Sequence, residues 1–163
     1  MNIFVAAGTH PQPFDRLFRA LDELKAKGGL KDEVFAQTGH SAYVPKSFES
    51  KSLLDLNEFN RRFAWADLVI THGGAGSILT AFEAGKKVMV VPRQKKFNEH
   101  TNDHQLELAR VLAVEGKALE VVDIKDLEKT IEKARTFKPD LQTSKQGLVK
   151  AIREKLKEWE RKK

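Results

Sequence analysis

The sequence of 163 residues contains no cysteine and no long apolar run. The lack of cysteine excludes a disulfide framework, a cysteine-ligated zinc site and thiol catalysis. The apolar start, Met1–Ala7, lacks the basic residues of a secretory signal, and it is far shorter than the roughly 20 residues of a membrane span. We therefore expect a soluble, cytoplasmic protein that contacts a membrane only through its surface or a partner.

Aromatic residues are also scarce, at 8% of the chain, and few of them lie among the basic residues. Binding of single-stranded nucleic acid by base stacking is therefore not indicated, and we expect no nucleic-acid partner. The net charge is +6, and part of the excess lies between Lys145 and Lys163. Basic and acidic residues interleave there at helical spacing, which favours a solvated helix face over a docking site for anionic lipid.

Short apolar runs alternate with segments of helical spacing along the chain. A parallel sheet covered by helices on both faces produces this pattern, because its strands are buried on both faces. The sequence predicts one α/β domain over residues 1–163, Rossmann-like with a mostly parallel sheet, including a helical tail from about 140 to 163. The expected strands are Ile3–Ala7, Val34–Thr38, Leu68–Thr71, Val88–Val91 and Ala118–Val122, and the expected helices are Phe14–Ala26, Leu56–Trp65, Ser77–Ala84, His104–Val114, Ile124–Arg135 and Leu148–Trp159.

Four predicted loops contain nearly every unusual residue of the chain. They span residues 8–14, 39–56, 72–77 and 93–105. Ligands of open parallel sheets bind beyond the carboxyl ends of the strands, where such loops gather. We expect the functional site at that edge of the sheet.

The loop at 72–77 is a run of small residues between a predicted strand and a predicted helix. Glycines let the backbone approach an anion closely, and a helix start offers unpaired N–H groups with partial positive charge. A diphosphate fits this chemistry, and a tight turn without a ligand is the alternative. Neither the Lys-Ser/Thr of a P-loop nor the G-x-G-x-x-G spacing is present. The candidate anion-binding residues are His72, Gly73, Gly74, Ala75, Gly76 and Ser77.

The loop at 93–105 is long and polar and leads into a predicted helix. Its many donors and acceptors suit a ligand covered with hydroxyl groups. His100 and His104 are four residues apart and could share a helix face, but the sequence places no third ligand, so we expect no metal site. A solvated loop with a helix cap at Asn102 or Asp103 is the alternative.

The loop at 8–14 carries Thr9 and His10 at the same edge of the sheet, and two prolines give it an irregular path. A helix entered through proline explains this loop equally well. Gly39 ends the second predicted strand at that edge and adds little by itself.

Several motifs in this order resemble the soluble, donor-binding subunit of two-subunit UDP-sugar glycosyltransferases, which have the GT-B fold and a domain of the glycosyltransferase family 28 C-terminal type. Members include the catalytic subunit of the dolichol-pathway N-acetylglucosaminyltransferase and bacterial exopolysaccharide subunits. The C-terminal domain of the peptidoglycan N-acetylglucosaminyltransferase is more distantly similar. The resemblance covers about residues 1–115. The motifs are Gly8-Thr9, Pro13–Leu17, Thr71–Ser77, Gly85–Arg93 and Glu99-His100-x-x-Asp103-His104-Gln105.

The resemblance implies a fold equivalent to the C-terminal half of a GT-B enzyme, and it implies roles for matching residues. Thr80 stands where many GT-B enzymes have a ribose-binding glutamate, and Glu83 on the same helix face could substitute for it. His10 is the only local candidate for a catalytic base. The implied sets are His72–Ser77 for the diphosphate; Glu99, His100, Asp103, His104 and Gln105 for the donor sugar; Asp55, Leu56, Thr80, Glu83 and Arg93 for uracil and ribose; and Gly8, Thr9 and Gly39 for the cleft.

The resemblance further implies an inverting transferase that moves a sugar from a UDP-sugar to a lipid-linked acceptor. No cofactor or metal would be required, because the glycine turn and the helix dipole would stabilise the leaving UDP. A membrane-anchored, acceptor-binding subunit would supply the missing half of the cleft and hold the chain at the membrane. Two alternatives remain: a non-catalytic nucleotide-binding module, and a metal-dependent hydrolase that uses His100, Asp103 and His104.

Overall fold

The computed structural model describes residues 1–140 and, in the tail, residues 152, 154, 157, 158 and 161. Within these residues a six-stranded sheet has the order β3-β2-β1-β4-β5-β6, and every neighbouring pair of strands is parallel. The predicted parallel α/β fold is confirmed. The strands are β1 (Asn2–Ala6), β2 (Glu33–Gln37), β3 (Glu49–Lys51), β4 (Leu68–Thr71), β5 (Lys87–Val90) and β6 (Leu119–Glu120).

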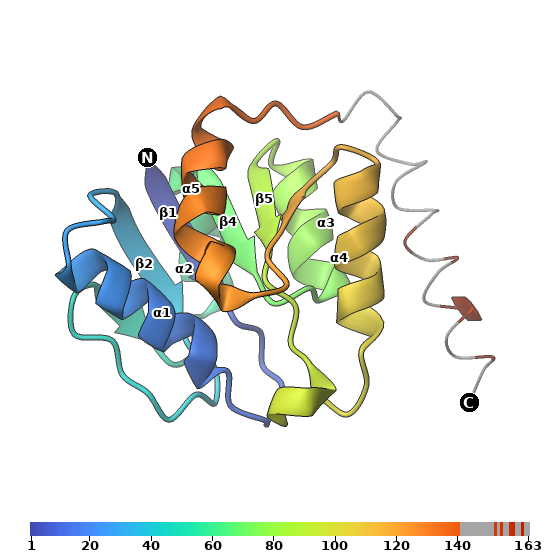
Figure 1. The fold of residues 1–163 in the computed structure, drawn as a ribbon, viewed down its shortest axis with the longest axis horizontal. Helices are drawn as coiled ribbons and strands as arrows, with labels where there is room; N and C mark the ends of the chain where they lie inside the picture. The colour runs from blue at the N-terminus through green and yellow to red at the C-terminus, as the bar shows by residue number, and fades with distance from the viewer. Residues whose placement is uncertain (141–151, 153, 155–156, 159–160, 162–163) are drawn as a thin grey trace.

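Helices cover both faces of the sheet, as Figure 1 shows. The side chains of β1 alternate between the faces: Ile3 and Val5 pack in the cluster that contains α1 and α5, whereas Phe4 packs with α2, α3 and α4. The central strands β1, β4 and β5 are largely apolar because both of their faces are buried. The helices are α1 (Asp15–Ala26), α2 (Leu56–Trp65), α3 (Ala75–Glu83), α4 (His104–Val114) and α5 (Leu127–Thr136), with 3-10 turns η1 (Lys95–Phe97) and η2 (Ile124–Asp126).

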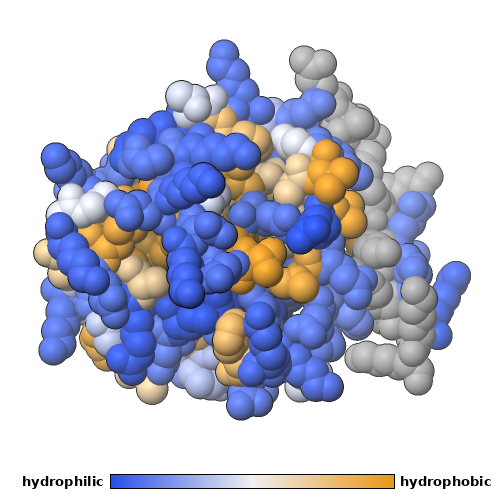
Figure 2. Space-filling view, in the orientation of Figure 1, coloured by the Kyte–Doolittle hydropathy of each residue, from blue (hydrophilic) through white to orange (hydrophobic). Residues whose placement is uncertain are grey.

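Solvent-facing side chains of the helices are mostly charged or polar. Figure 2 shows a largely hydrophilic face with smaller apolar areas between the charged side chains. In α1, for example, Leu17, Phe18 and Leu21 are buried, whereas Arg19 and Glu23 are exposed. This division is the usual one for an amphipathic helix lying on a sheet.

Four details differ from the sequence-based expectations. The segment 39–56 was expected to be a loop, but it contains β3, a polar edge strand with no apolar run to reveal it. Helix α3 begins at Ala75, two residues before the expected start, and β6 has only two residues. The expected helix from Ile124 begins as the 3-10 turn η2, and α5 follows at Leu127.

Only part of the predicted tail helix can be compared with the structure. Ile152 is helical and 2% exposed, and it belongs to the core cluster that includes Leu108 and Leu112 of α4. The helical spacing of Leu148, Ile152, Leu156 and Trp159 predicts an apolar stripe that is buried against this domain or a partner. The burial of Ile152 within this chain agrees with that prediction. The other three stripe positions, Leu148, Leu156 and Trp159, lie outside the described residues.

Within the described part of the chain, no helix combines the length and the apolar character needed to cross a membrane.

Candidate functional site

The chain adds β2 and β3 on one side of β1 and then β4, β5 and β6 on the other, so the switch point of the sheet lies between β1 and β4. His72 directly follows β4, and its side chain contacts the carboxyl end of β1. In open parallel sheets, ligands bind at such a switch point. The Nδ1 atom of His72 lies 3.1 Å from the carbonyl oxygen of Ala6. A carbonyl can only accept, so Nδ1 carries the proton. Burial lowers the pKa of His72 to about 4, and the ring is therefore neutral at pH 7.

Glycines surround His72 because its ring fills the space that side chains would need. A Cβ atom at Gly8 or at Gly74 would lie under 3.0 Å from the imidazole. A Cβ atom at Gly39 would meet the carbonyl oxygen of Gly8 just as closely. Gly8 and Gly39 also have positive φ angles, of 76° and 60°. The loops after β1, β2 and β4 thus pack together through contacts of their backbone atoms and of the His72 ring.

Helix α3 begins in this cluster without a side-chain cap. Its N-cap residue is Gly74, and its first turn contains no acidic residue. Helix α2 is different, because the carboxylate of Asp55 accepts a hydrogen bond from the amide of Glu58. Gly76, in the first turn of α3, is exposed, and a Cβ atom there would meet nothing within 4 Å. An uncapped helix start of this kind favours an anion.

A cavity of about 200 Å³ lies beside the start of α3, between that helix and the first turns of α4. Asn102 was not among the residues expected at the donor sugar; its side-chain oxygen accepts a hydrogen bond from the amide of His104, the first residue of α4, at 3.1 Å. The N-cap residue of α4 is Asp103, one of the two positions considered from the sequence, and its side chain makes no capping hydrogen bond. The lining residues are Gly73, Gly74, Ala75, His100, Asn102, His104, Gln105 and Leu108.

Two further residues of the predicted sugar-binding set are tied to neighbouring backbone. The side-chain oxygen of Gln105 accepts a hydrogen bond from the amide of Arg93 at 3.2 Å. A carboxylate oxygen of Asp103 accepts one from the amide of Lys95 at 2.9 Å, and Asp103 is exposed near the cavity without lining it. These bonds hold the loop at 93–105 against the start of α4.

His10 and His100 stack on each other at the rim of the site. Their ring centroids are 4.5 Å apart, and the ring planes are inclined by 32°. The Nδ1 atom of each ring accepts a backbone N–H from the residue two positions later, Gln12 and Asn102, at 3.3 Å. Each neutral ring therefore carries its proton on Nε2. His100 lines the cavity, and its ring connects the cavity to His10.

The side chain of Arg93, which was expected at uracil or ribose, is fully buried. The guanidinium donates hydrogen bonds to the carbonyl oxygens of Ala7, Gln12 and Glu99, at 2.9, 2.6 and 3.1 Å. It therefore joins the loop after β1 to the loop after β5 instead of facing uracil or ribose. Burial lowers the pKa of Arg93 to about 10, which leaves it charged at neutral pH.

Glu99 also differs from its expected role at the donor sugar. Its side chain is 5% exposed and forms a two-pronged ion pair with Arg16, with both N···O distances at 2.9 Å. The sequence did not identify Arg16 as a partner, although the residue lies within the Pro13–Leu17 motif. Glu99 thus anchors the polar loop to α1 and directs no free oxygen toward a sugar.

The residues expected at uracil and ribose lie apart from the cavity lining. Asp55 and Leu56 form the exposed start of α2, and Leu56 is 73% exposed. The hydroxyl group of Thr80 donates to the carbonyl oxygen of Gly76 at 3.0 Å, within α3. Glu83 is exposed on the same helix. Thr9, expected at the cleft, is exposed in the loop after β1.

Among the residues that the structure describes, no three acidic or histidine side chains gather as a metal-binding group. His100, Asp103 and His104 do not form such a group in this structure.

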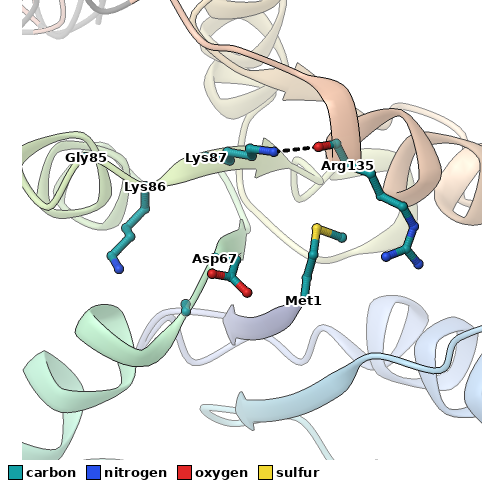
Figure 3. A pocket seen from close by; sticks show the side chains of 7 residues that line it. Met1, Asp67, Gly85, Lys86, Lys87 and Arg135 are labelled. Carbon is teal, nitrogen blue, oxygen red and sulfur yellow. Dashed lines mark hydrogen bonds between the residues drawn. The ribbon is translucent and has the colours of Figure 1, made fainter.

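A larger cavity, of about 420 Å³, lies at the opposite edge of the sheet, where β1, β4 and β5 begin. Figure 3 shows Lys87 reaching from β5 to the carbonyl oxygen of Arg135, a hydrogen bond of 2.9 Å. Lys86 donates to the carbonyl oxygen of Ala64. The two lysines thus donate hydrogen bonds to carbonyl groups at the carboxyl ends of α5 and α2. Ligands of open parallel sheets bind at the carboxyl edge, not at this amino edge.

The family model described as glycosyltransferase family 28 C-terminal domain matches residues 2–159. The chain belongs to this family. The family 28 domain is 37% identical over 123 residues to the human UDP-N-acetylglucosamine transferase subunit ALG13, a match that covers 70% of this chain and 10% of that protein. It is 32% identical over 98 residues to the UDP-N-acetylglucosamine--N-acetylmuramyl-(pentapeptide) pyrophosphoryl-undecaprenol N-acetylglucosamine transferase of Nitratidesulfovibrio vulgaris strain DP4, covering 60% of this chain and 24% of that protein.

The family 28 domain thus spans only a tenth to a quarter of the length of these two relatives. Among solved structures, the ALG13 solution structure superposes with a TM-score of 0.62 at 17% identity, covering 90% of this chain and 92% of that one. MurG of Acinetobacter baumannii superposes with a TM-score of 0.55 at 19% identity, covering 94% of this chain and 49% of that one. These likenesses establish the fold, and the expected family is confirmed.

Proposed function

We propose that this chain is the donor-binding subunit of an inverting glycosyltransferase that moves a sugar from a UDP-sugar to a lipid-linked acceptor. One observation carries the proposal: the uncapped start of α3 meets a cavity at the switch point of a family 28 domain. The names of the human and bacterial relatives support a UDP-N-acetylglucosamine donor. The word "subunit" in the human name supports a partnered enzyme.

The first step is binding of the donor diphosphate at the turn His72–Ser77. Amide groups at the start of α3 and the partial positive charge of the helix favour the phosphates there. The cavity next to this turn then receives the sugar, whose hydroxyl groups face His100, His104 and Gln105. Asp103 lies at the edge of the same space. The uracil faces the start of α2 at Asp55 and Leu56, and the ribose faces the side of α3 that carries Thr80 and Glu83.

The chemical step needs a stabilised leaving group and a proton acceptor. The start of α3 offsets the negative charge that develops on UDP as the bond to the anomeric carbon breaks. His10 can act as the base through Nδ1, where the acceptor hydroxyl would displace the 3.3 Å contact from the backbone N–H of Gln12. Burial, followed by the charge of Arg93, lowers the pKa of His10 and keeps the ring neutral. Its place at the rim suits an acceptor that approaches from outside this domain.

The second half of the cleft comes from a partner in this proposal. The domain covers 92% of the solved ALG13 chain but only 49% of the solved MurG chain. A membrane-anchored subunit would bind the lipid-linked acceptor and would hold the family 28 domain at the cytoplasmic face of the membrane. Gly8, Thr9 and Gly39 would then face that subunit across the cleft.

A calorimetric titration with UDP-sugars tests donor binding directly. Gly76→Asp places a carboxylate at the start of α3, where it favours the helix but repels a diphosphate. We expect affinity for UDP-N-acetylglucosamine to fall at least about tenfold, a loss of about 1.4 kcal/mol. Gly76→Asn is the matched neutral control and should bind within about threefold of the wild-type chain. Equal affinity in all three proteins would contradict the proposed diphosphate site.

Two further measurements separate this proposal from its alternatives. Binding in EDTA should equal binding in Mg²⁺ or Mn²⁺, because the helix start supplies the positive potential. Transfer of sugar should appear only when the chain is combined with an acceptor-binding membrane subunit. Donor binding without transfer in any such combination would favour a non-catalytic nucleotide-binding module.

A further inference from the structure

The stacked rings of His10 and His100 form a pair that the loop architecture holds in place. Arg93 donates to the carbonyl oxygen of Glu99, the residue before His100, and to that of Gln12, two residues after His10. The Arg16–Glu99 ion pair ties the same loop to α1. The buried guanidinium of Arg93 and the ion pair hold both loops in place, so the positions of the two stacked rings are set by the fold.

The groups that influence the pair electrostatically are cationic or ionisable. His72 lies at the end of β4, the guanidinium of Arg93 lies after β5, and His104 lies in the first turn of α4. Glu99 is the acidic neighbour, and it is paired with Arg16. The pair is therefore influenced by one fixed positive charge and by other imidazoles, and the carboxylate of the adjacent Glu99 is paired with Arg16.

This environment keeps both rings neutral in the free protein. Burial is the largest cause of the lowered pKa of His100, followed by the His10 ring and Arg93. Burial, followed by Arg93, lowers the pKa of His10. An anion bound in the cavity that His100 lines would raise the pKa of the pair, because a nearby negative charge favours the protonated imidazole.

We propose that the His10–His100 pair takes up one proton from solvent when the diphosphate of a donor binds, and thereby serves as a charge-neutralising part of the binding site. The proton is added to Nδ1 of His100, the ring that lines the cavity, since its Nε2 already carries one, and it displaces the 3.3 Å contact from the backbone N–H of Asn102, so that His10 stays neutral. The resulting imidazolium lies beside the dianionic ligand. This inference rests on the proposed donor site and extends it to two residues that act as one unit.

Linkage determines the direction of the pH dependence. Affinity is highest when the free protein already carries the proton, and it falls as pH rises between the pKa of the free pair and that of the bound pair, by at most about tenfold per pH unit. The probe is UDP-N-acetylglucosamine, because the sugar esterifies its terminal phosphate. Free UDP is unsuitable, since its terminal phosphate ionises near roughly pH 6.

The test is calorimetry of the full chain at pH 7 in two phosphate-free buffers with different ionisation enthalpies. We expect the observed binding enthalpy to differ between the buffers by an amount that corresponds to uptake of up to about one proton per ligand. The double variant His10→Gln/His100→Gln should lose this difference and bind as the wild-type chain does at high pH. His40→Gln, an exposed histidine outside the pair, should retain the difference.

The outcomes distinguish the inference from the function on which it rests. Equal binding enthalpies in both buffers would overturn the inference and leave donor binding intact. Uptake that persists in the double variant would assign the proton to His72 or His104 and would also overturn it. The absence of any binding to UDP-N-acetylglucosamine by folded protein would contradict the proposed function itself.

Discussion

The imidazole of His72 occupies the space that a side chain at Gly74 would need, with a Cβ atom there under 3.0 Å from the ring. Gly74 has a φ of −68° and a ψ of 128°, which any residue can adopt. Backbone strain therefore does not explain glycine at this position. The ring of His72 alone excludes a larger residue, and it does so at the point where α3 begins.

The first prediction tests this packing. Gly74→Ala should destabilise the chain by about 1–3 kcal/mol, because the added methyl group forces His72 away from the carbonyl oxygen of Ala6. Gly76→Ala, two residues later with open space around it, should stay within about 1 kcal/mol of the wild-type chain. Urea unfolding measures both. If the alanine costs the same at both positions, the ring does not restrict Gly74.

The second prediction concerns acid stability. The pKa of His72 is about 4 in the folded chain and 6.5 without perturbation, so between these values the unfolded state binds a proton that the folded state does not. The contribution of His72 to the free energy of unfolding therefore has its full value above about pH 6.5. It is lost as pH falls toward 4, by up to about 3 kcal/mol. His72→Gln should remove that component. Parallel pH curves of unfolding free energy for the two proteins would contradict the assignment.

The third prediction addresses the buried guanidinium. Arg93→Lys keeps the charge, but a single ammonium cannot reach the carbonyl oxygens of Ala7, Gln12 and Glu99 together. We expect a loss of about 2–4 kcal/mol, because buried carbonyl groups are left unpaired. Arg110→Lys is the surface control; its side chain is 64% exposed and pairs with Glu120, so the change should cost under about 1 kcal/mol. Similar melting temperatures for the two variants would count against the bridging role.

The fourth prediction concerns the tail. Ile152→Ala should destabilise the chain by about 2–4 kcal/mol, because Ile152 is 2% exposed within the core cluster that contains Leu112. Val114→Ala is the control, because Val114 is 79% exposed on α4. Thermal unfolding of the chain without a partner is the measurement. An unchanged melting temperature in Ile152→Ala would mean that the tail is not part of the core of this domain.

The fold was predictable because its signals are local. Strands buried on both faces must be apolar throughout, so β1, β4 and β5 are visible as runs such as Leu68–Thr71, whereas the polar edge strand β3 left no such signal. Helix α4 was predicted to the residue, because a polar loop gives way to helical spacing at His104. Family membership was also predictable, because the glycine turn and the motif ending at Gln105 are each a short, continuous stretch of sequence.

The destinations of polar side chains were not predictable in the same way. Arg93 was expected at uracil or ribose, but its guanidinium binds the carbonyl oxygen of Ala7, 86 positions earlier in the chain. Glu99 was expected at the donor sugar, but its carboxylate pairs with Arg16, 83 positions away. A long polar side chain can reach many partners, and the sequence does not show which of them the sheet order brings within hydrogen-bonding distance.

The sequence by itself determined the parallel α/β architecture, the family, and the edge of the sheet at which the unusual residues gather, because apolar runs and glycine turns are read locally. Only the tertiary structure decided that His10 stacks on His100, that His72 joins β1 to β4, and that α3 begins without a cap. These relationships exist because the crossover connections bring the carboxyl ends of distant strands together, and that proximity cannot be inferred from spacing along the chain.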